Sequence, residues 1–86
     1  MSIVTSTFGF VRLTRVEPCN DHTLLLTFET GEKRLYDFKP DLDIPVFEPL
    51  KDVDLFMQAK GHGYAVVWNE DIDIASEALY YNGIAV

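Results

Sequence analysis

The sequence predicts an α+β fold, with a small, mainly antiparallel sheet of about four or five strands and two short helices. Three observations support this class. Short runs of β-branched and aromatic residues alternate with polar ones and are separated by turn residues. Two other segments show helical periodicity. The chain has 86 residues, 48% hydrophobic and 13% aromatic, which suits one folded domain with a small core.

A single α+β domain is predicted at residues 10–86. Residues 1–9 are mostly small and polar, and we expect them to form a loose N-terminal leader without the features of a secretory signal. No apolar run approaches the ~20 residues that a membrane-spanning helix needs. The single cysteine, Cys19, cannot form an internal disulfide. We therefore expect a cytoplasmic protein that does not enter a membrane.

Three strands are predicted in the first half of the chain. The first covers residues 10–18, where β-branched residues alternate with others and Pro18 marks the end. The turn sequence CNDH separates it from a second strand at residues 23–29. A third strand follows at residues 32–38. Connections this short favour antiparallel pairing between neighbours.

The turn between the second and third strands determines which side chains share a face. Threonine resists positive φ, so we predict a type I turn followed by Gly31 in the left-handed region. Phe28 then pairs with Glu32. In this register Leu25 and Leu35 share the face opposite to the core. The side chains predicted on the core face are Leu24, Leu26, Phe28, Arg34, Tyr36 and Phe38.

A proline-rich segment and a short helix are predicted next. Three prolines in residues 39–50 exclude a regular helix or a central strand and so predict an ordered crossover loop. A helix is predicted at residues 52–59, with Asp52 as its N-cap, and Gly61 and Gly63 end it. Its inward face is expected to carry Val53, Phe56 and Ala59.

The last third of the chain is predicted to hold two strands and a closing helix. The apolar run at residues 64–68 predicts a strand buried on both faces. A short edge strand is expected at residues 71–74. The closing helix covers residues 76–83, about two turns, and we expect either Asp73 or Ser76 to cap it.

Trp68 and the acids that follow it concentrate functional groups in a short stretch. The single tryptophan is predicted to anchor the core by packing against the helix that carries Leu79. In the alternative interpretation its ring is exposed and binds a partner. Asp71 and Asp73 would share a strand face, but no third ligand for a hard cation is evident. We interpret these acids as helix-starting and solvent-facing groups.

No motif in the sequence indicates catalysis or cofactor binding. Cys19 and His22 form one metal-like pair, and no second pair completes a zinc site. His62 lies between two glycines and is interpreted as a solvated loop histidine. Phosphate-binding glycine loops, nucleophile elbows and metalloprotease helices are all missing from the sequence. We predict no catalytic residue, no metal site and no cofactor.

The acidic residues are concentrated in the second half of the chain. The net charge is −7, from 7 basic and 14 acidic residues. Up to Lys39 there are five residues of each sign, whereas two basic and nine acidic residues follow. A chain with this excess repels polyanions, which disfavours direct binding of nucleic acid.

Three functional hypotheses follow. The first is a non-enzymatic protein-interaction or regulatory module, which binds a protein partner with basic groups through a sheet edge or the acidic second half. An exposed strand edge also permits a homodimer. The alternative is a nucleic-acid-associated regulator with a local basic sheet patch, formed by Arg12, Arg15, Lys33 and Arg34. The third is a small enzyme or ligand binder around His62, Asp71 and Asp73. The candidate partner-binding residues are Arg12, Arg15, Arg34, Trp68, Asp71 and Asp73.

The chain resembles a bacterial family of short uncharacterised proteins, domain-of-unknown-function family 2442, in four segments: LLLTFETGEKRLYDFKP, VFEPLKDVDLF, YAVVW and DIDIASEALY. The resemblance extends from about Val11 to Tyr80. It implies a small α+β domain, sometimes fused ahead of a helix-turn-helix domain and often encoded beside another small protein. It also implies a regulatory or toxin–antitoxin-like role. The sequence departs from the family at Ala75-Ser76, where an acid or serine followed by proline is common.

Overall fold

The structure is a computed structural model that describes residues 12–86. The leader expected at residues 1–9 lies outside the described residues. Antiparallel strands and short helices make up the described part, which confirms the predicted α+β class. The strands are divided between two sheets, one of four strands and one of three. No helix in residues 12–86 is long and apolar enough to cross a membrane.

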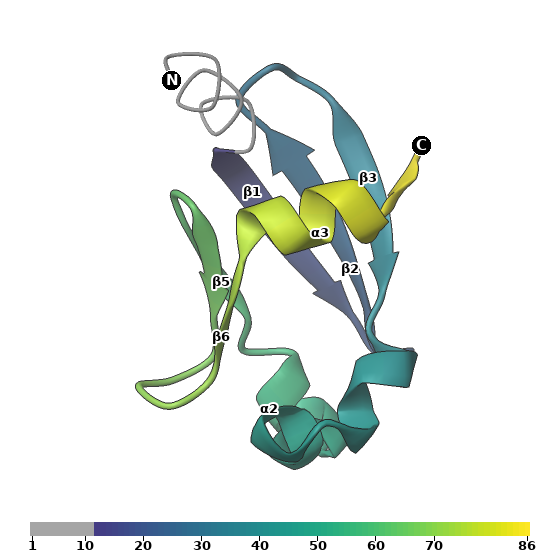
Figure 1. Cartoon of the computed structure of the whole chain (residues 1–86), viewed down its shortest axis with the longest axis vertical. Helices are drawn as coiled ribbons and strands as arrows, with labels where there is room; N and C mark the ends of the chain where they lie inside the picture. Colours follow the sequence, from purple (N-terminus) through teal and green to yellow (C-terminus); the bar gives the residue numbers. More distant parts are fainter. Residues whose placement is uncertain (1–11) are drawn as a thin grey trace.

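The large sheet has the strand order β1-β2-β3-β7, and each strand is antiparallel to its neighbour (Figure 1). The first three strands agree with the prediction. The sequence does not predict β7, because a strand of two residues carries no periodicity. The last strand is held by pairing with β3, and the Val86 N–H donates to the Lys33 carbonyl at 3.1 Å. The strands are β1 (Leu13–Cys19), β2 (Thr23–Phe28), β3 (Lys33–Asp37) and β7 (Ile84–Ala85).

The register of the β2–β3 hairpin is the predicted one. Gly31 has a φ of 90°, and the Phe28 N–H donates to the Glu32 carbonyl at 2.9 Å. Leu25 lies opposite Leu35, on the face away from the core. On the core face, Arg34 is partly buried and the other predicted side chains are buried: Leu24, Leu26, Phe28, Tyr36 and Phe38.

The small sheet has the order β4-β5-β6, with β4 (Lys60–His62), β5 (Ala65–Val67) and β6 (Asp73–Ala75). The edge strand predicted at residues 71–74 is present as β6 but begins at Asp73, so the expectation that Asp71 and Asp73 share a strand face is wrong. The sequence does not predict β4, where the glycines make a hairpin with β5 instead of only ending a helix. Gly61 also lets β4 approach β1, because a Cβ atom there would lie 2.9 Å from Cγ2 of Val16.

The strand predicted at residues 64–68 is buried on one face only. Val66 is buried, whereas its neighbours Ala65 and Val67 are partly exposed. The prediction of burial on both faces is therefore wrong. The three-stranded sheet leaves the second face of β5 open to partial solvent contact.

Three short helices form what we call the helical segment, residues 39–56: η1 (Lys39–Asp43), η2 (Pro45–Lys51) and α2 (Val53–Phe56). As predicted, residues 39–50 contain no regular α-helix, but they form two 3-10 helices where the sequence predicts a loop. Both 3-10 helices have a proline in their first two positions, where its missing N–H costs no hydrogen bond. The side chain of Asp52 accepts from the Asp54 N–H at 3.0 Å, which confirms the predicted cap of α2. Val53 is exposed, contrary to the prediction, while Phe56 and Ala59 are buried.

The closing helix α3 (Ser76–Asn82) begins without a side-chain cap. The N-cap residue is Ala75, so the prediction that Asp73 or Ser76 caps the helix is wrong. Ser76 is buried as the first helical residue, and its N–H donates to the Tyr64 carbonyl at 2.8 Å. A contact with the β4–β5 turn therefore satisfies one of the backbone N–H groups that have no partner within the helix.

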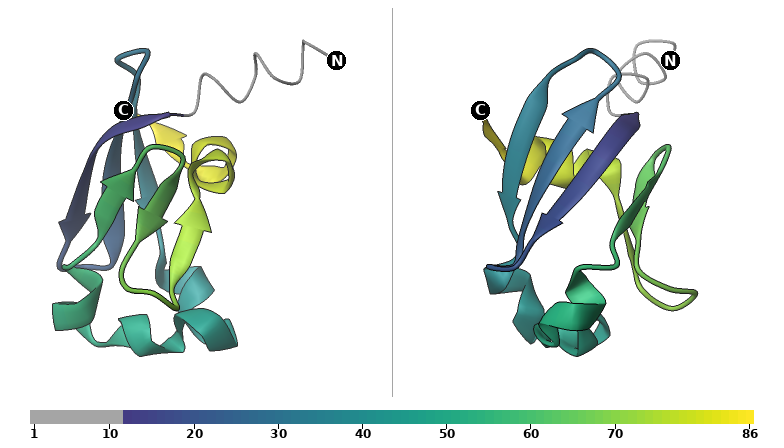
Figure 2. Two further views of the ribbon diagram at one scale, coloured as in Figure 1. Left: turned by 90° about the vertical axis from the view of Figure 1, so that its left-hand side faces the viewer. Right: turned by 180° about the vertical axis from the view of Figure 1, so that it is seen from behind.

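The core lies between the large sheet, α3 and the helical segment. α3 crosses one face of the large sheet, and the helical segment closes the lower end of the molecule (Figures 1 and 2). Phe38, just after β3, is at the centre of an aromatic cluster. Its ring centroid lies 5.1 Å from that of Phe47, 5.7 Å from Phe56 and 5.4 Å from Trp68. The opposite face of the large sheet, which we call the outer face, points away from this core.

Candidate functional site

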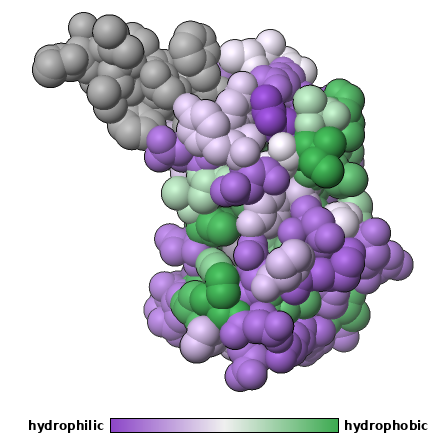
Figure 3. Space-filling view, turned by 45° about the vertical axis from the view of Figure 1, so that its right-hand side comes forward, coloured by the Kyte–Doolittle hydropathy of each residue, from purple (hydrophilic) through white to green (hydrophobic). Residues whose placement is uncertain are grey.

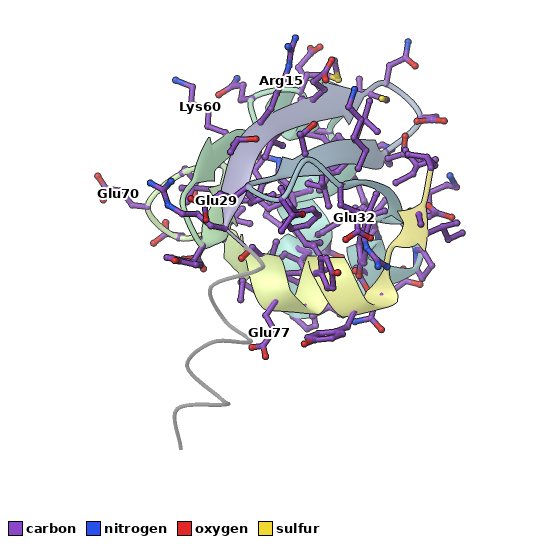
Figure 4. All side chains as sticks on the ribbon, turned by 90° about the horizontal axis from the view of Figure 1, so that it is seen from above. Arg15, Glu29, Glu32, Lys60, Glu70 and Glu77 are labelled. Carbon is purple, nitrogen blue, oxygen red and sulfur yellow. The ribbon has the colours of Figure 1, made fainter. Side chains whose placement is uncertain are left out.

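The predicted basic patch does not form one surface. Arg15 lies opposite Thr27, which lies opposite Lys33, so these three side chains share the outer face. Arg34 lies opposite Leu26 and points to the core face. Figure 4 shows Arg15 directed away from α3. The expectation that the four basic residues share a face is wrong, because successive residues of a strand point to opposite faces.

Arg12 and Arg15, which with Arg34 are the candidate arginines, each lie near an acidic side chain. Nη1 of Arg12 lies 4.0 Å from a carboxylate oxygen of Glu29, and Nε of Arg15 lies 3.2 Å from one of Glu17. All four side chains are well exposed to solvent. These acids offset the positive charge that contacts with phosphates would need.

Arg34 is part of a clamp between the hairpin and α3. Its Nη2 lies 2.6 Å from Oε2 of Glu32, and its guanidinium carbon lies 4.1 Å from the centroid of the Tyr80 ring. The Tyr80 hydroxyl donates to the other oxygen of Glu32 at 2.8 Å. Nη1 of Arg34 also donates to the Gly83 carbonyl at 3.3 Å. These contacts give Arg34 a role in positioning α3 and β7.

Trp68 is a core residue. Its side chain is only 6% exposed, and the indole N–H donates to the Phe56 carbonyl at 3.0 Å. The core-anchor interpretation is therefore confirmed, and the interpretation as an exposed partner-binding ring is wrong. The predicted neighbour was the helix of Leu79. The rings and the hydrogen-bond acceptor that hold Trp68 come instead from Phe38 and Phe56.

Asp71 and Asp73 lie at the exposed end of the small sheet. Asp71 belongs to the loop before β6, and Asp73 is the first residue of that strand. Oδ1 of Asn69 accepts from the N–H groups of Asp71 and Ile72, at 2.8 Å and 3.0 Å, and so shapes the loop. Within residues 12–86, no three acidic, histidine or cysteine side chains are placed to hold a metal ion.

His22 has a structural contact that its spacing from Cys19 does not reveal. Its Nε2 lies 2.8 Å from the Leu50 carbonyl, and its ring centroid lies 4.9 Å from that of Phe56. The carbonyl can only accept, so Nε2 carries the proton in this contact. The residue also has a φ of 64°, so it forms the turn as well as linking that turn to η2.

The outer face carries a row of aliphatic side chains across three strands. Leu25 of β2 lies opposite Leu35 of β3, and Leu35 lies opposite Ile84 of β7. We call these residues the aliphatic row. Leu25 and Leu35 are partly exposed, and Ile84 is 71% exposed. Seen from behind, no helix within residues 12–86 covers this face (Figure 2, right). The sequence predicts Leu25 and Leu35 here and misses Ile84, which only the pairing of β7 places beside them.

Hydrophobic surface gathers at the upper right of Figure 3, on the side of the molecule where β3 and β7 lie. Val86, which follows Ile84 on the same side of the strand, is 72% exposed. Contiguous apolar surface of this kind is a common mark of a protein-interaction site. The outer face is therefore the candidate functional surface of the described residues.

A cleft of about 440 Å³ lies at the edge of β3, beside β7 and the start of η1, and Asn82 of α3 also lines it. Asp37 and Asp41 contribute carboxylates to its lining, and Leu35, Pro40 and Ile84 contribute apolar surface. The hydroxyl of Tyr36, which also lines the cleft, donates to Asp41. Burial, followed by this carboxylate, raises the pKa of the Tyr36 phenol, so it stays protonated as a donor. The cleft therefore combines apolar walls with acceptor oxygens.

Asp21 and Asp37, at this end of the sheet, are expected to make the free energy of unfolding depend on pH in the acid range. The backbone N–H of Lys39 lowers the pKa of Asp37 from its ordinary value of 3.8, and the Thr23 hydroxyl lowers that of Asp21. A lowered folded-state pKa contributes stability above the unfolded-state pKa, and this is lost as the pH falls through the folded-state pKa. We expect this contribution to be constant above about pH 5 and to decrease below about pH 4.

Urea unfolding followed by Trp68 fluorescence measures this effect. The free energy of unfolding should fall as the pH decreases below about 4 in the native chain. The double variant Asp21→Asn with Asp37→Asn serves as the control and should show a shallower fall. An identical pH dependence in the control would show that these two groups do not contribute.

Together these features define a small α+β domain with two antiparallel sheets, in which no helix of residues 12–86 covers the outer face of the large sheet (Figure 2, right). The model of a family described as "Protein of unknown function (DUF2442)" matches residues 13–85. The chain therefore belongs to this family, as the resemblance of its four segments indicates. Searches of curated proteins and of solved structures find no significant match.

Proposed function

We propose that the protein is a small non-enzymatic module that binds a protein partner through its outer face. The observation that carries the proposal is the aliphatic row, Leu25, Leu35 and Ile84, which lies on adjacent strands without a covering element in residues 12–86. Burial of aliphatic surface against a partner is the main favourable term in most protein association. A regulatory role would act through this contact.

The net charge of the whole chain favours a partner with basic groups. The net charge is −7, and the acids of the helical segment and of the β5–β6 loop are exposed to solvent. Charges around an interface increase the association rate and contribute specificity, and salt screens both effects. The complex is therefore expected to weaken as the salt concentration rises. The exposed acids that support this expectation are Asp43, Glu48, Asp52, Asp54, Glu70, Asp71 and Asp73.

Affinity capture with the native chain and a face-specific variant tests the proposal. Leu35→Glu puts a charge in the centre of the aliphatic row, whereas Tyr81→Glu changes a residue of α3 that is 57% exposed. The native chain and Tyr81→Glu should retain the same protein at about 50 mM salt, and Leu35→Glu should lose it. Retention should decrease at about 500 mM salt.

Two results would count against the proposed function. One is that the native chain retains no specific protein at low salt. The other is that Leu35→Glu, shown by Trp68 fluorescence to be folded, retains the same protein as the native chain. Trp68 suits this check because it is buried and is the only tryptophan.

A further inference from the structure

We propose that the outer face binds a second copy of this chain, related by a two-fold axis that runs along the aliphatic row. The inference rests on the proposed function and names its partner. The sequence suggests that two copies could pair at an exposed strand edge, but both edges of the large sheet are partly occupied. β7 covers part of the β3 edge, and the Leu13 N–H at the start of β1 already donates to the Gly63 carbonyl at 2.7 Å. The outer face, by contrast, has no covering helix within residues 12–86 (Figure 2, right).

The charges of the outer face are arranged in a two-fold complementary way. Arg15 and Lys33 lie on one side of the aliphatic row, and Asp37 lies on the other. A two-fold axis along the row reverses the strand direction across the interface, so the basic side of each copy faces the acidic side of the other. An axis parallel to the strands would place basic groups against basic groups. Charge complementarity therefore selects the first arrangement.

On β3 this arrangement matches individual residues. Leu35 lies midway between Lys33 and Asp37 in the strand. An axis that passes at Leu35 places Lys33 of each copy opposite Asp37 of the other. Lys33 is exposed and, within residues 12–86, has no ion-pair partner of its own. Two reciprocal ion pairs would thus flank a central contact between the two Leu35 side chains.

The cleft beside Asp37 can receive the lysine side chain of the second copy. Leu35 and Ile84 give it apolar walls that suit the methylene stem of a lysine. Asp37 and Asp41 give it carboxylate oxygens that accept from the ammonium group. The volume of about 440 Å³ exceeds what one lysine side chain fills, so the fit does not require the cleft to open.

Three features act against this contact and set its expected strength. The first is the net charge of −7 on each copy, so two copies repel each other overall and only the local charges of the outer face attract. Lys39 already lies 3.1 Å from a carboxylate oxygen of Asp37, so the incoming charge shares that carboxylate. Glu17 lies opposite Leu25 at the β1 end of the row, so the Glu17 side chains of the two copies would approach each other, each held by its own Arg15. We therefore expect a dimer that depends on salt and concentration.

Exchanging the two charges of the predicted pair is the most direct test. In Lys33→Glu alone, and in Asp37→Lys alone, both symmetric contacts become repulsive. Each variant should have a dimer dissociation constant on the order of tenfold or more above that of the native chain. In an equimolar mixture, the introduced acid of one variant faces the introduced base of the other, and the unchanged Lys33 faces the unchanged Asp37. The mixture should therefore recover the dimer.

Sedimentation velocity over a range of concentrations gives all of these constants, with Trp68 fluorescence as the check of folding. Leu35→Glu, which places two like charges on the axis, should be monomeric. Tyr81→Glu should dimerise like the native chain. A native chain that stays monomeric at about 1 mM, or a mixture that does not recover the dimer, would overturn the inference. A different result would overturn this inference alone and leave the proposed function in place. In that result the native chain is monomeric but captures another protein, and the Leu35→Glu variant does not capture it.

Discussion

Replacement of Trp68 by alanine is expected to destabilise the domain strongly, because Trp68 fixes the helical segment against the strands. The variant loses the ring contacts with Phe38 and Phe56 and leaves the Phe56 carbonyl without its 3.0 Å hydrogen bond. Large-to-small changes at buried aromatic positions cost about 3–5 kcal/mol. A domain of this length has a total stability of roughly 4–13 kcal/mol, so the loss is a large part of it. Urea unfolding followed by far-ultraviolet circular dichroism measures the change.

Trp68→Phe is the matched control for this variant. Phenylalanine keeps much of the ring packing but cannot donate to the Phe56 carbonyl, so we expect a smaller loss of about 1–3 kcal/mol. If Trp68→Ala keeps the native free energy of unfolding and loses only partner binding, the assignment of Trp68 to the core is contradicted.

Replacement of Phe38 by alanine is the second change with a large expected effect. Phe38 has no solvent exposure, and its ring contacts Tyr36, Phe47, Phe56 and Trp68. It follows β3 directly and is the N-cap residue of η1, so its ring links the large sheet to the helical segment. We expect a loss of about 3–5 kcal/mol. Trp68 fluorescence during urea unfolding reports this loss, because the indole ring lies next to the cavity.

Two controls distinguish cavity formation from a general effect of substitution. Phe38→Leu fills more of the space and should cost less than Phe38→Ala. Tyr81→Ala removes a ring that is 57% exposed and should leave the free energy of unfolding nearly unchanged. Equal losses in Phe38→Ala and Tyr81→Ala would contradict the central position of Phe38 in the core.

The core face and the outer face of the large sheet are connected through Arg34. Its guanidinium group donates to the Gly83 carbonyl directly before β7, and β7 carries Ile84 onto the outer face. Gly83 is closely surrounded, since a Cβ atom there would lie 2.8 Å from the Leu79 carbonyl oxygen. The clamp around Arg34 therefore fixes the position of Ile84, which belongs to the proposed interface. The clamp itself lies on the core face of the sheet.

Local features of the sequence determined the β-hairpin. A threonine followed by Gly31 set the turn, and the alternation of Leu24, Leu25 and Leu26 set the faces, because both depend on backbone conformation within a few residues. The cap of α2 by Asp52 follows from the same kind of local hydrogen bond. These features can be predicted because their energies depend little on the rest of the chain.

The tertiary structure alone decided where the remaining functional groups lie. Nothing near Trp68 in the sequence indicates that its ring packs on Phe38 and donates to Phe56. The two residues of β7 become a strand only because β3 offers unpaired backbone groups beside them, and this pairing completes the aliphatic row with Ile84. Such contacts join residues far apart in the chain, and the free energy that fixes them comes from burial and pairing in the folded state, which local sequence patterns do not encode.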